Sequence, residues 1–259
     1  MIKDAEGGVR AAVLLAGGAP LRSALVGAGP GDWLALDAGV REIAWHRPGV
    51  LPEWEHSAPL PVDLTQVDEA RLAVALCHRD GRIRQEALRR SSRCPDLLPL
   101  IVLRCADWVG PVREHARRLL REALDVDAAI RFAPLILRVG RRDRGVFGVE
   151  VLGETLRRAS RGRLAALFAS SDRGVRRFAY RLAADSRLPR PAELARVAAQ
   201  DEDTVIQDLC ATAAIEAPRD TEAYEDVLPL VAAGMDAGAD ARGQPGGTGR
   251  RRRPAPAFM

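Results

Sequence analysis

Arginine is the residue type whose positions in this chain suggest chemistry. Arg84, Arg113 and Arg176 each follow a branched apolar residue directly and precede an alanine by three residues. A guanidinium holds carboxylates and phosphates through a fixed fork of N–H donors, so arginines repeated at one place would form a line of such donors. Each could bridge an aspartate of its own or a neighbouring turn, or meet the acidic or phosphate groups of a partner. We favour the bridging account, in which the acceptors are Asp80, Asp107 and Asp172.

A second group of candidates lies on the expected solvent side of helices. Arg117, Arg177 and Arg181 belong to this group, and a solvated helix face is the simplest account of them. Trp108 precedes one of these helices. We expect its ring to fill the groove between two repeats, and the alternative is that it stacks on a base or a partner side chain. The candidate binding surface therefore consists of Arg84, Trp108, Arg113, Arg117, Arg176, Arg177 and Arg181.

The histidine, cysteine and glycine patterns argue against metal, cofactor and enzyme chemistry. The four histidines are scattered and none precedes a glutamate, while the four cysteines include no CxxC pair. The glycine run 27–31 lacks a β-branched strand before it, and no GxSxG, Walker lysine or HExxH motif occurs. We expect no metal, no cofactor and no catalytic activity, and we interpret the cysteines as small buried thiols in a reducing cytoplasm.

The net charge of +4 belongs to the end of the chain. Residues 241–259 contain five of the 39 basic residues and no acid, which leaves 34 basic against 35 acidic residues, a net of −1. A general electrostatic argument for nucleic-acid binding therefore fails for the body, although a local patch remains open. No run approaches the roughly 18 apolar residues of a membrane span. The apolar run 11–19 is too short and glycine-broken for a signal peptide, so we expect a cytoplasmic protein with no membrane partner.

The elements that would position these residues are paired helices. Aromatic residues make up only 4% of the chain, so its apolar mass is Ala, Leu and Val, which suits closely packed helices. Apolar stripes at helical spacing recur in a series of amphipathic helices, several of them opened by an aspartate such as Asp172. More apolar helices lie between them and carry Pro99, Pro134 and Pro229. The anchor residues of the amphipathic helices recur at spacings of 29, 34, 29 and 30 and are Ile83, Val112, Val146, Val175 and Val205.

This pattern resembles the HEAT-repeat family over about residues 66–233. The shared features are the proline of the first helix, the aspartate in the turn, and the Val-Arg-x-x-Ala opening of the second helix. Phe147 and Ile206 depart from the family pattern, since they stand where the arginine is expected. The resemblance implies an all-α fold, an α-α superhelix of about five helical hairpins whose second helices line a concave face.

The function we predict is a non-catalytic scaffold that binds an unknown protein partner on the concave face, although such arrays serve many roles. The alternative is a nucleic-acid-binding protein resembling the HEAT-like alkylpurine DNA glycosylases. Their cationic face with aromatic and acidic residues would correspond to Asp107, Trp108, Arg113 and Arg117. A role like that of the HEAT-like bilin lyases is a third alternative, without a visible bilin-binding motif. A continuous positive stripe with an exposed Trp108 would favour nucleic acid, and a mixed or acidic face would favour protein.

The N-terminal segment, residues 1–64, does not show the repeat and is expected to be irregular and partly helical. Short helices ended by glycine precede the stretch 32–45, which is either one helix, as we favour, or two short strands. Trp33, Trp45 and Trp54 are expected to form the core of this segment.

The repeats are expected to occupy residues 65–234, and the Arg/Gly/Pro-rich tail 235–259 to be disordered. A first helix containing Pro229 would then lack its second helix. A truncated or frameshifted reading frame would explain this, and so would a protein that caps its end by dimerising.

Overall fold

The computed structural model of this chain describes residues 2–46, 68–186 and 190–216. In these residues every regular element is a helix and no strand occurs, which confirms the expected all-α fold. The chain divides into two compact units, Met1–Leu182 and Ala183–Met259.

Several sequence predictions fall outside the described residues. They include the helix expected at Pro229, the tail 235–259 and the boundary expected at residue 64. The core roles expected for Trp45 and Trp54 also lie outside the side chains that the structure describes.

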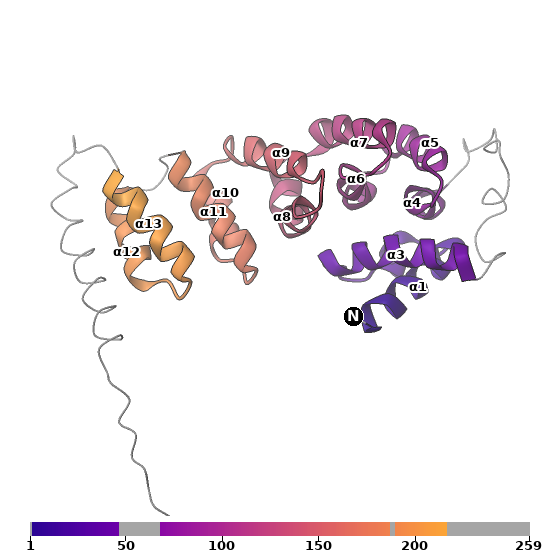
Figure 1. Cartoon of the computed structure of the whole chain (residues 1–259), viewed down its shortest axis with the longest axis horizontal. Coiled ribbons are helices and arrows are strands. Elements are labelled where there is room, and N and C mark those ends of the chain that lie inside the picture. Colours follow the sequence, from indigo (N-terminus) through magenta and orange to yellow (C-terminus); the bar gives the residue numbers. More distant parts are fainter. Residues whose placement is uncertain (1, 47–67, 187–189, 217–259) are drawn as a thin grey trace, which may run out of the picture. The chain divides into compact units, whose positions relative to one another are not determined.

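The first unit contains three successive helical hairpins (Figure 1). In each hairpin the first helix packs along the second, and neighbouring hairpins contact each other through both their first and their second helices. A row of first helices therefore lies beside a row of second helices. The first helices are α4 (Glu69–Cys77), α6 (Leu98–Arg104) and α8 (Val126–Gly140), and the second helices are α5 (Gly81–Ser91), α7 (Gly110–Ala123) and α9 (Val146–Leu156).

Aspartates fix where several of these helices begin. The Asp80 carboxylate accepts the backbone N–H of Arg82 at the start of α5, at 2.8 Å. Asp172 accepts the N–H groups of Gly174 and Val175 at the start of α11 (Arg173–Asp185), which confirms its predicted capping role. Each such bond satisfies a donor that has no partner inside the helix. Local helix capping therefore explains Asp80 and Asp172.

The N-terminal segment forms a third layer against the first helices (Figure 1). It comprises α1 (Ile2–Ala16), α2 (Leu21–Ala24) and α3 (Pro30–His46), so the expected helix over 32–45 is confirmed and the two-strand alternative is wrong. α3 contacts α4, α6 and α8, and α1 packs on α3 and α4. α1 and α3 cross at Gly8 and Gly39, where a Cβ on either glycine would overlap the backbone of the other helix.

The third layer explains why two first helices are apolar on every side. All seven residues of α6 are buried, and so are all residues of α4 from Leu72 to Cys77. A helix that is apolar all round must be covered on more than one face. The row of second helices covers one side of α4 and α6, and the N-terminal layer covers the other.

In two of the second helices, the residue that is buried near the helix start is not the predicted anchor residue. Ile83, Val112 and Val175 are buried as expected, and each is the third residue of its helix. Val146 and Val205 are 60% and 39% exposed, so their assignment as anchors is wrong. α9 begins two residues later than the pattern implies, and α13 (Thr204–Glu216) begins one residue later. The third residue of each is again buried, and these residues are Gly148 and Ile206.

The remaining helices are a short 3-10 helix, η3 (Pro95–Leu97), and α10 (Arg161–Phe168) in the first unit, with α12 (Pro191–Gln200) packed on α13 in the second. Pro99 and Pro134 lie in first helices, as predicted. Pro99 lies in the first turn of α6, where its missing N–H costs nothing, and Pro134 lies inside α8.

Candidate functional site

Arg84 is the best-connected of the predicted site residues, and it is entirely buried. Its Nε and Nη2 donate to the two carboxylate oxygens of Asp107 in the next turn, both at 2.8 Å. Its Nη1 donates to the carbonyls of His78 and Arg79, also at 2.8 Å. The bridging account is therefore confirmed for Arg84, and its inclusion in a binding surface is wrong, because the side chain has no exposed area.

The ion pair continues into the N-terminal layer through Arg104 and Asp37. Arg104, the last residue of α6, binds Asp37 of α3 and reaches Asp107 at 3.3 Å. Burial would lower the pKa of Arg104, but the charges of Asp37 and Asp107 outweigh it and raise the pKa. The four charges alternate along a buried chain, and this chain connects α3, α5, α6 and the turn before α7.

Asp107 is a structural carboxylate in this network. Burial would raise its pKa, but the hydrogen bonds from Arg84 and the charge of Arg104 overcome that effect and hold the pKa below its usual value. One oxygen also accepts the backbone N–H of Val109 at 2.9 Å. The acidic role that the glycosylase resemblance implied for Asp107 requires an accessible carboxylate, and this one is 5% exposed and fully engaged.

Trp108 is the one predicted site residue with a large exposed ring. Its side chain is 65% exposed, so the expectation that it fills a groove between repeats is wrong. The Arg84 guanidinium lies 5.8 Å from the ring centroid. A buried cation therefore approaches the indole, while most of the ring surface is open to a partner.

The remaining arginines of the predicted surface do not form one line of free donors. Arg113 donates to the carbonyl of Asp107 at 2.8 Å. Arg117 donates to the carbonyls of Cys105 and Arg144, and its guanidinium lies 4.8 Å from the ring centroid of Phe147. Arg176 and Arg177 are half-buried and Arg181 is exposed, all on α11.

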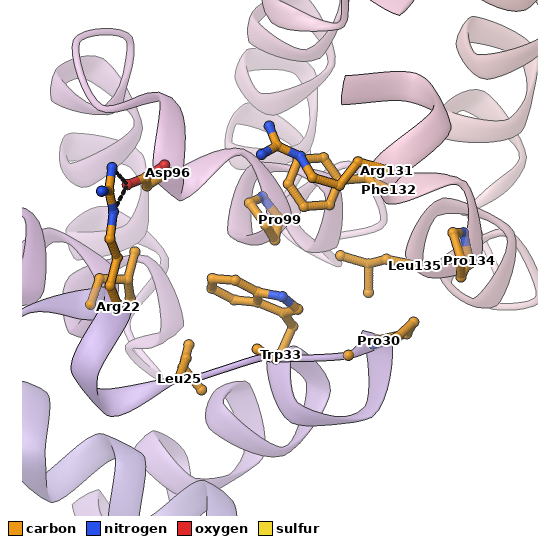
Figure 2. Close-up of a pocket in the computed structure, with 13 residues that line it drawn as sticks. Arg22, Leu25, Pro30, Trp33, Asp96, Pro99, Arg131, Phe132, Pro134 and Leu135 are labelled. Carbon is orange, nitrogen blue, oxygen red and sulfur yellow. Dashed lines mark hydrogen bonds and ion pairs between the residues drawn. The ribbon is translucent and has the colours of Figure 1, made fainter. Parts of the chain in front are cut away.

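A second site, which the sequence did not suggest, is an apolar pocket of about 350 Å³ between α2, α3, α6 and α8. In Figure 2 the Trp33 ring lies between Leu25 and Pro30 on one side and Pro99, Phe132 and Leu135 on the other. Arg22 and Asp96 form an ion pair at its rim, with Nη2 2.9 Å from the carboxylate. The guanidinium of Arg131, another lining residue, lies 4.7 Å from the Phe132 centroid. The pocket is therefore apolar inside, and charged residues of both signs lie at its rim.

The cysteines are free thiols whose pKa values burial raises. The pKa of Cys105 rises to about 12 and that of Cys210 to about 11, so both stay protonated near neutral pH. Cys77 is also fully buried and Cys94 half-buried. The interpretation of the cysteines as small buried thiols is confirmed for all but Cys94, which is partly exposed.

Among the described residues, histidine, cysteine and carboxylate side chains do not gather in threes or more in a way that could hold a metal ion. Within the same ranges, every helix is too short or too polar to cross a bilayer.

Comparison of the chain with protein-family models, with curated proteins and with solved structures found no match.

Sequence reasoning missed Asp37, Arg104 and the pocket for a common reason. Asp37 is 67 residues from Arg104, in a segment outside the repeat, so no spacing links them. One available signal was the stretch Leu98–Arg104, which is apolar throughout and ends in an arginine. An arginine at the end of a helix that is buried on all sides requires a buried anion, and that anion comes from α3.

Proposed function

We propose that this chain is a non-catalytic helical-repeat scaffold of the HEAT type, an α-solenoid, that binds a protein partner. The order of the hairpins supports the solenoid, since each hairpin of the first unit packs on the next along the chain. The observation that carries the binding function is the open apolar pocket beside Trp33.

The pocket suits an apolar side chain of a protein. Its volume of about 350 Å³ is at the small end of the range for ligand sites, roughly 300–1,000 Å³. The lining groups Trp33, Pro99 and Phe132 provide an apolar interior, while the Arg22–Asp96 pair and Arg131 provide rim partners of both signs. Interfaces between proteins have this arrangement of an apolar centre and a polar rim.

The charge of the second helices also supports a protein partner. The exposed charged residues of α5, α7 and α9 are four arginines and four glutamates. A balanced surface of this kind does not attract a phosphate backbone, which requires an excess of cations. The residues are Arg82, Arg89, Arg118, Arg121, Glu114, Glu122, Glu150 and Glu154.

Co-purification with a filled pocket tests the proposal. Ala28→Trp places an indole in the pocket, and Val26→Trp adds the same indole two residues away at a position that is 83% exposed. From the cells that produce the protein, we expect a partner that the wild type and Val26→Trp retain and Ala28→Trp loses. Circular dichroism should show equal helix content in all three. Retention of every partner by Ala28→Trp would contradict the proposal.

A further inference from the structure

The turns between first and second helices lie side by side along one edge of the first unit. The Arg84–Asp107 pair joins the turn 78–81 to the turn 105–109, and a Cβ on Gly81 would lie 3.0 Å from Val109. Arg117 joins the second of these turns to the turn 141–145, since it donates to the carbonyls of Cys105 and Arg144 at 3.2 and 3.0 Å. We call this surface, formed by three turns, the turn edge.

The turn edge carries an excess of cations that the protein itself does not neutralise. Arg141, Arg142 and Arg144 of the turn edge are exposed, as is Arg82, which directly follows the turn 78–81. None of the four forms an ion pair with another residue in the described part of the chain. The turns contain three aspartates, and two of them accept hydrogen bonds from the protein itself. Asp80 and Asp107 accept backbone N–H groups and Asp107 also binds Arg84, while Asp143 is exposed.

One arginine of the edge is held in a conformation that favours glycine. Arg144 has a φ of +73°, in the left-handed region, which costs a non-glycine residue of order 1 kcal/mol. Its carbonyl accepts a hydrogen bond from Arg117. The backbone thus holds an exposed guanidinium at a place where glycine would be less strained.

Arg142 lies near two other cations of the first unit. Burial lowers its pKa; the charge of Asp37 opposes this, and the charges of Arg104 and Arg41 lower the pKa further. Arg142 therefore lies near two other arginines, Arg104 and Arg41, and near the carboxylate of Asp37. A further carboxylate from outside would reduce their mutual repulsion.

We propose that the turn edge binds an acidic segment of a protein partner, with carboxylates on Arg82, Arg141, Arg142 and Arg144 and an apolar or aromatic side chain on Trp108. The inference rests on the proposed function, because it takes the partner to be a protein. It adds a second contact surface and the chemistry of the segment that this surface recognises.

The edge fits a peptide better than single-stranded nucleic acid. Proteins that hold single strands stack successive bases on a series of aromatic rings, and the edge exposes the ring of Trp108 alone among its described residues. The adjoining second helices carry as many exposed glutamates as arginines, which disfavours a continuous phosphate chain.

The test measures the fluorescence anisotropy of a labelled peptide of glutamates with a central phenylalanine, mixed with the full chain. The double variant Arg141→Glu/Arg144→Glu removes cations from the edge. Arg157→Glu/Arg158→Glu makes the same change of charge with exposed arginines just after α9, at the end of the helix opposite the turn edge. We expect the edge variant to raise the Kd about tenfold or more and the control variant less than about twofold, with Trp108→Ala raising it about threefold.

Two results would overturn the inference. Equal weakening by both double variants would assign binding to overall charge, including the arginines of the tail. Tighter binding of oligothymidylate than of the peptide, lost in the edge variant, would assign the edge to nucleic acid. Ala28→Trp should leave peptide binding unchanged. If the edge fails this test while Ala28→Trp still loses a partner, the proposed function stands and only the edge assignment falls.

Discussion

The Arg84 guanidinium and the Asp107 carboxylate join two neighbouring hairpins through parallel hydrogen bonds, Nε to Oδ2 and Nη2 to Oδ1, each 2.8 Å long. Both side chains are at most 1% exposed. The same guanidinium also binds the carbonyls of His78 and Arg79, so one side chain fixes both turns. The pair therefore sets the position of Trp108, which directly follows Asp107.

Breaking this pair on one side should destabilise the first unit strongly. Arg84→Ala or Asp107→Ala leaves a buried charge without its partner, which costs about 3–5 kcal/mol. The double variant Arg84→Met/Asp107→Leu removes both charges and should be closer to the wild type than either single variant. Urea unfolding followed by circular dichroism measures these differences. A double variant as unstable as the sum of the single variants would contradict the ion-pair explanation.

The stability of the first unit should fall as the pH decreases from 6.5 to 4. Burial lowers the pKa of His78 to about 4, with the charge of Asp80 opposing this and those of Arg79 and Arg84 adding to it. In this window the unfolded chain binds a proton at His78 that the folded chain does not bind. The free energy of unfolding therefore decreases by at most about 3 kcal/mol as the pH falls.

His78→Gln supplies the comparison for this pH dependence. The variant keeps a side-chain acceptor near the Asp80 N–H, which donates to His78 Nδ1 at 2.9 Å in the wild type. Urea unfolding across the window should show a smaller slope for the variant. His115, whose pKa burial also lowers, gives both proteins a remaining slope of the same sign. Identical slopes in the two proteins would refute the assignment to His78.

Two tryptophans should differ sharply in their contribution to stability. Trp33 is 9% exposed, so Trp33→Ala should cost about 3–5 kcal/mol. Trp108 is 65% exposed, so Trp108→Ala should cost under about 1 kcal/mol, mainly its contact with Arg84. Thermal unfolding measures both. A large loss in Trp108→Ala would restore the view that this ring fills a groove.

Substitutions of two adjacent residues test which side of α13 is buried. Ile206 is 1% exposed and Val205 is 39% exposed. Ile206→Ala should destabilise the second unit by about 2–5 kcal/mol, because it leaves a cavity, while Val205→Ala should be nearly neutral. Hydrogen exchange of the α13 amides reports on this unit directly. Equal loss of protection in both variants would mean that the helix has another orientation.

Replacing each of two adjacent glycines in α1 by alanine should change the stability in opposite directions. Gly7 has nothing within 4 Å of an added Cβ, so Gly7→Ala should stabilise α1 by about 0.5–1 kcal/mol. At Gly8 the same methyl group would overlap the Ala35 carbonyl of α3, so Gly8→Ala should separate the two helices and lower the melting temperature. A neutral effect of Gly8→Ala would mean that α1 can shift on α3 without cost.

The parts of the fold that the sequence predicted are those with local causes. Asp172 caps its helix through N–H groups two and three residues away, and helical spacing identifies the buried stripe around Val112 and Val175. The assignment of Val146 and Val205 as buried anchor residues is wrong because a shift of one or two residues in the helix start changes which residue is buried. Boundaries of this kind depend on capping and packing together.

The third layer and both candidate surfaces depend on contacts that no spacing reveals. Asp37 and Arg104, or Trp33 and Phe132, meet only after α3 packs on the first helices. The all-round apolar character of α6 is a sequence feature that requires such a cover, but it does not identify the covering segment. Of the predicted surface, Trp108 is exposed in the turn edge, and Arg113 and Arg117 bind backbone carbonyls beside it.

The position of α3 has a consequence for how the first unit unfolds. A plain repeat array behaves as a one-dimensional chain, in which a hairpin can open when it loses one neighbour. α3 contacts α4, α6 and α8 together and anchors to Arg104 by a buried charge, so the three hairpins share a common brace. Under mechanical pulling, these hairpins should yield in a single large step, where an unbraced array would give a series of small ones.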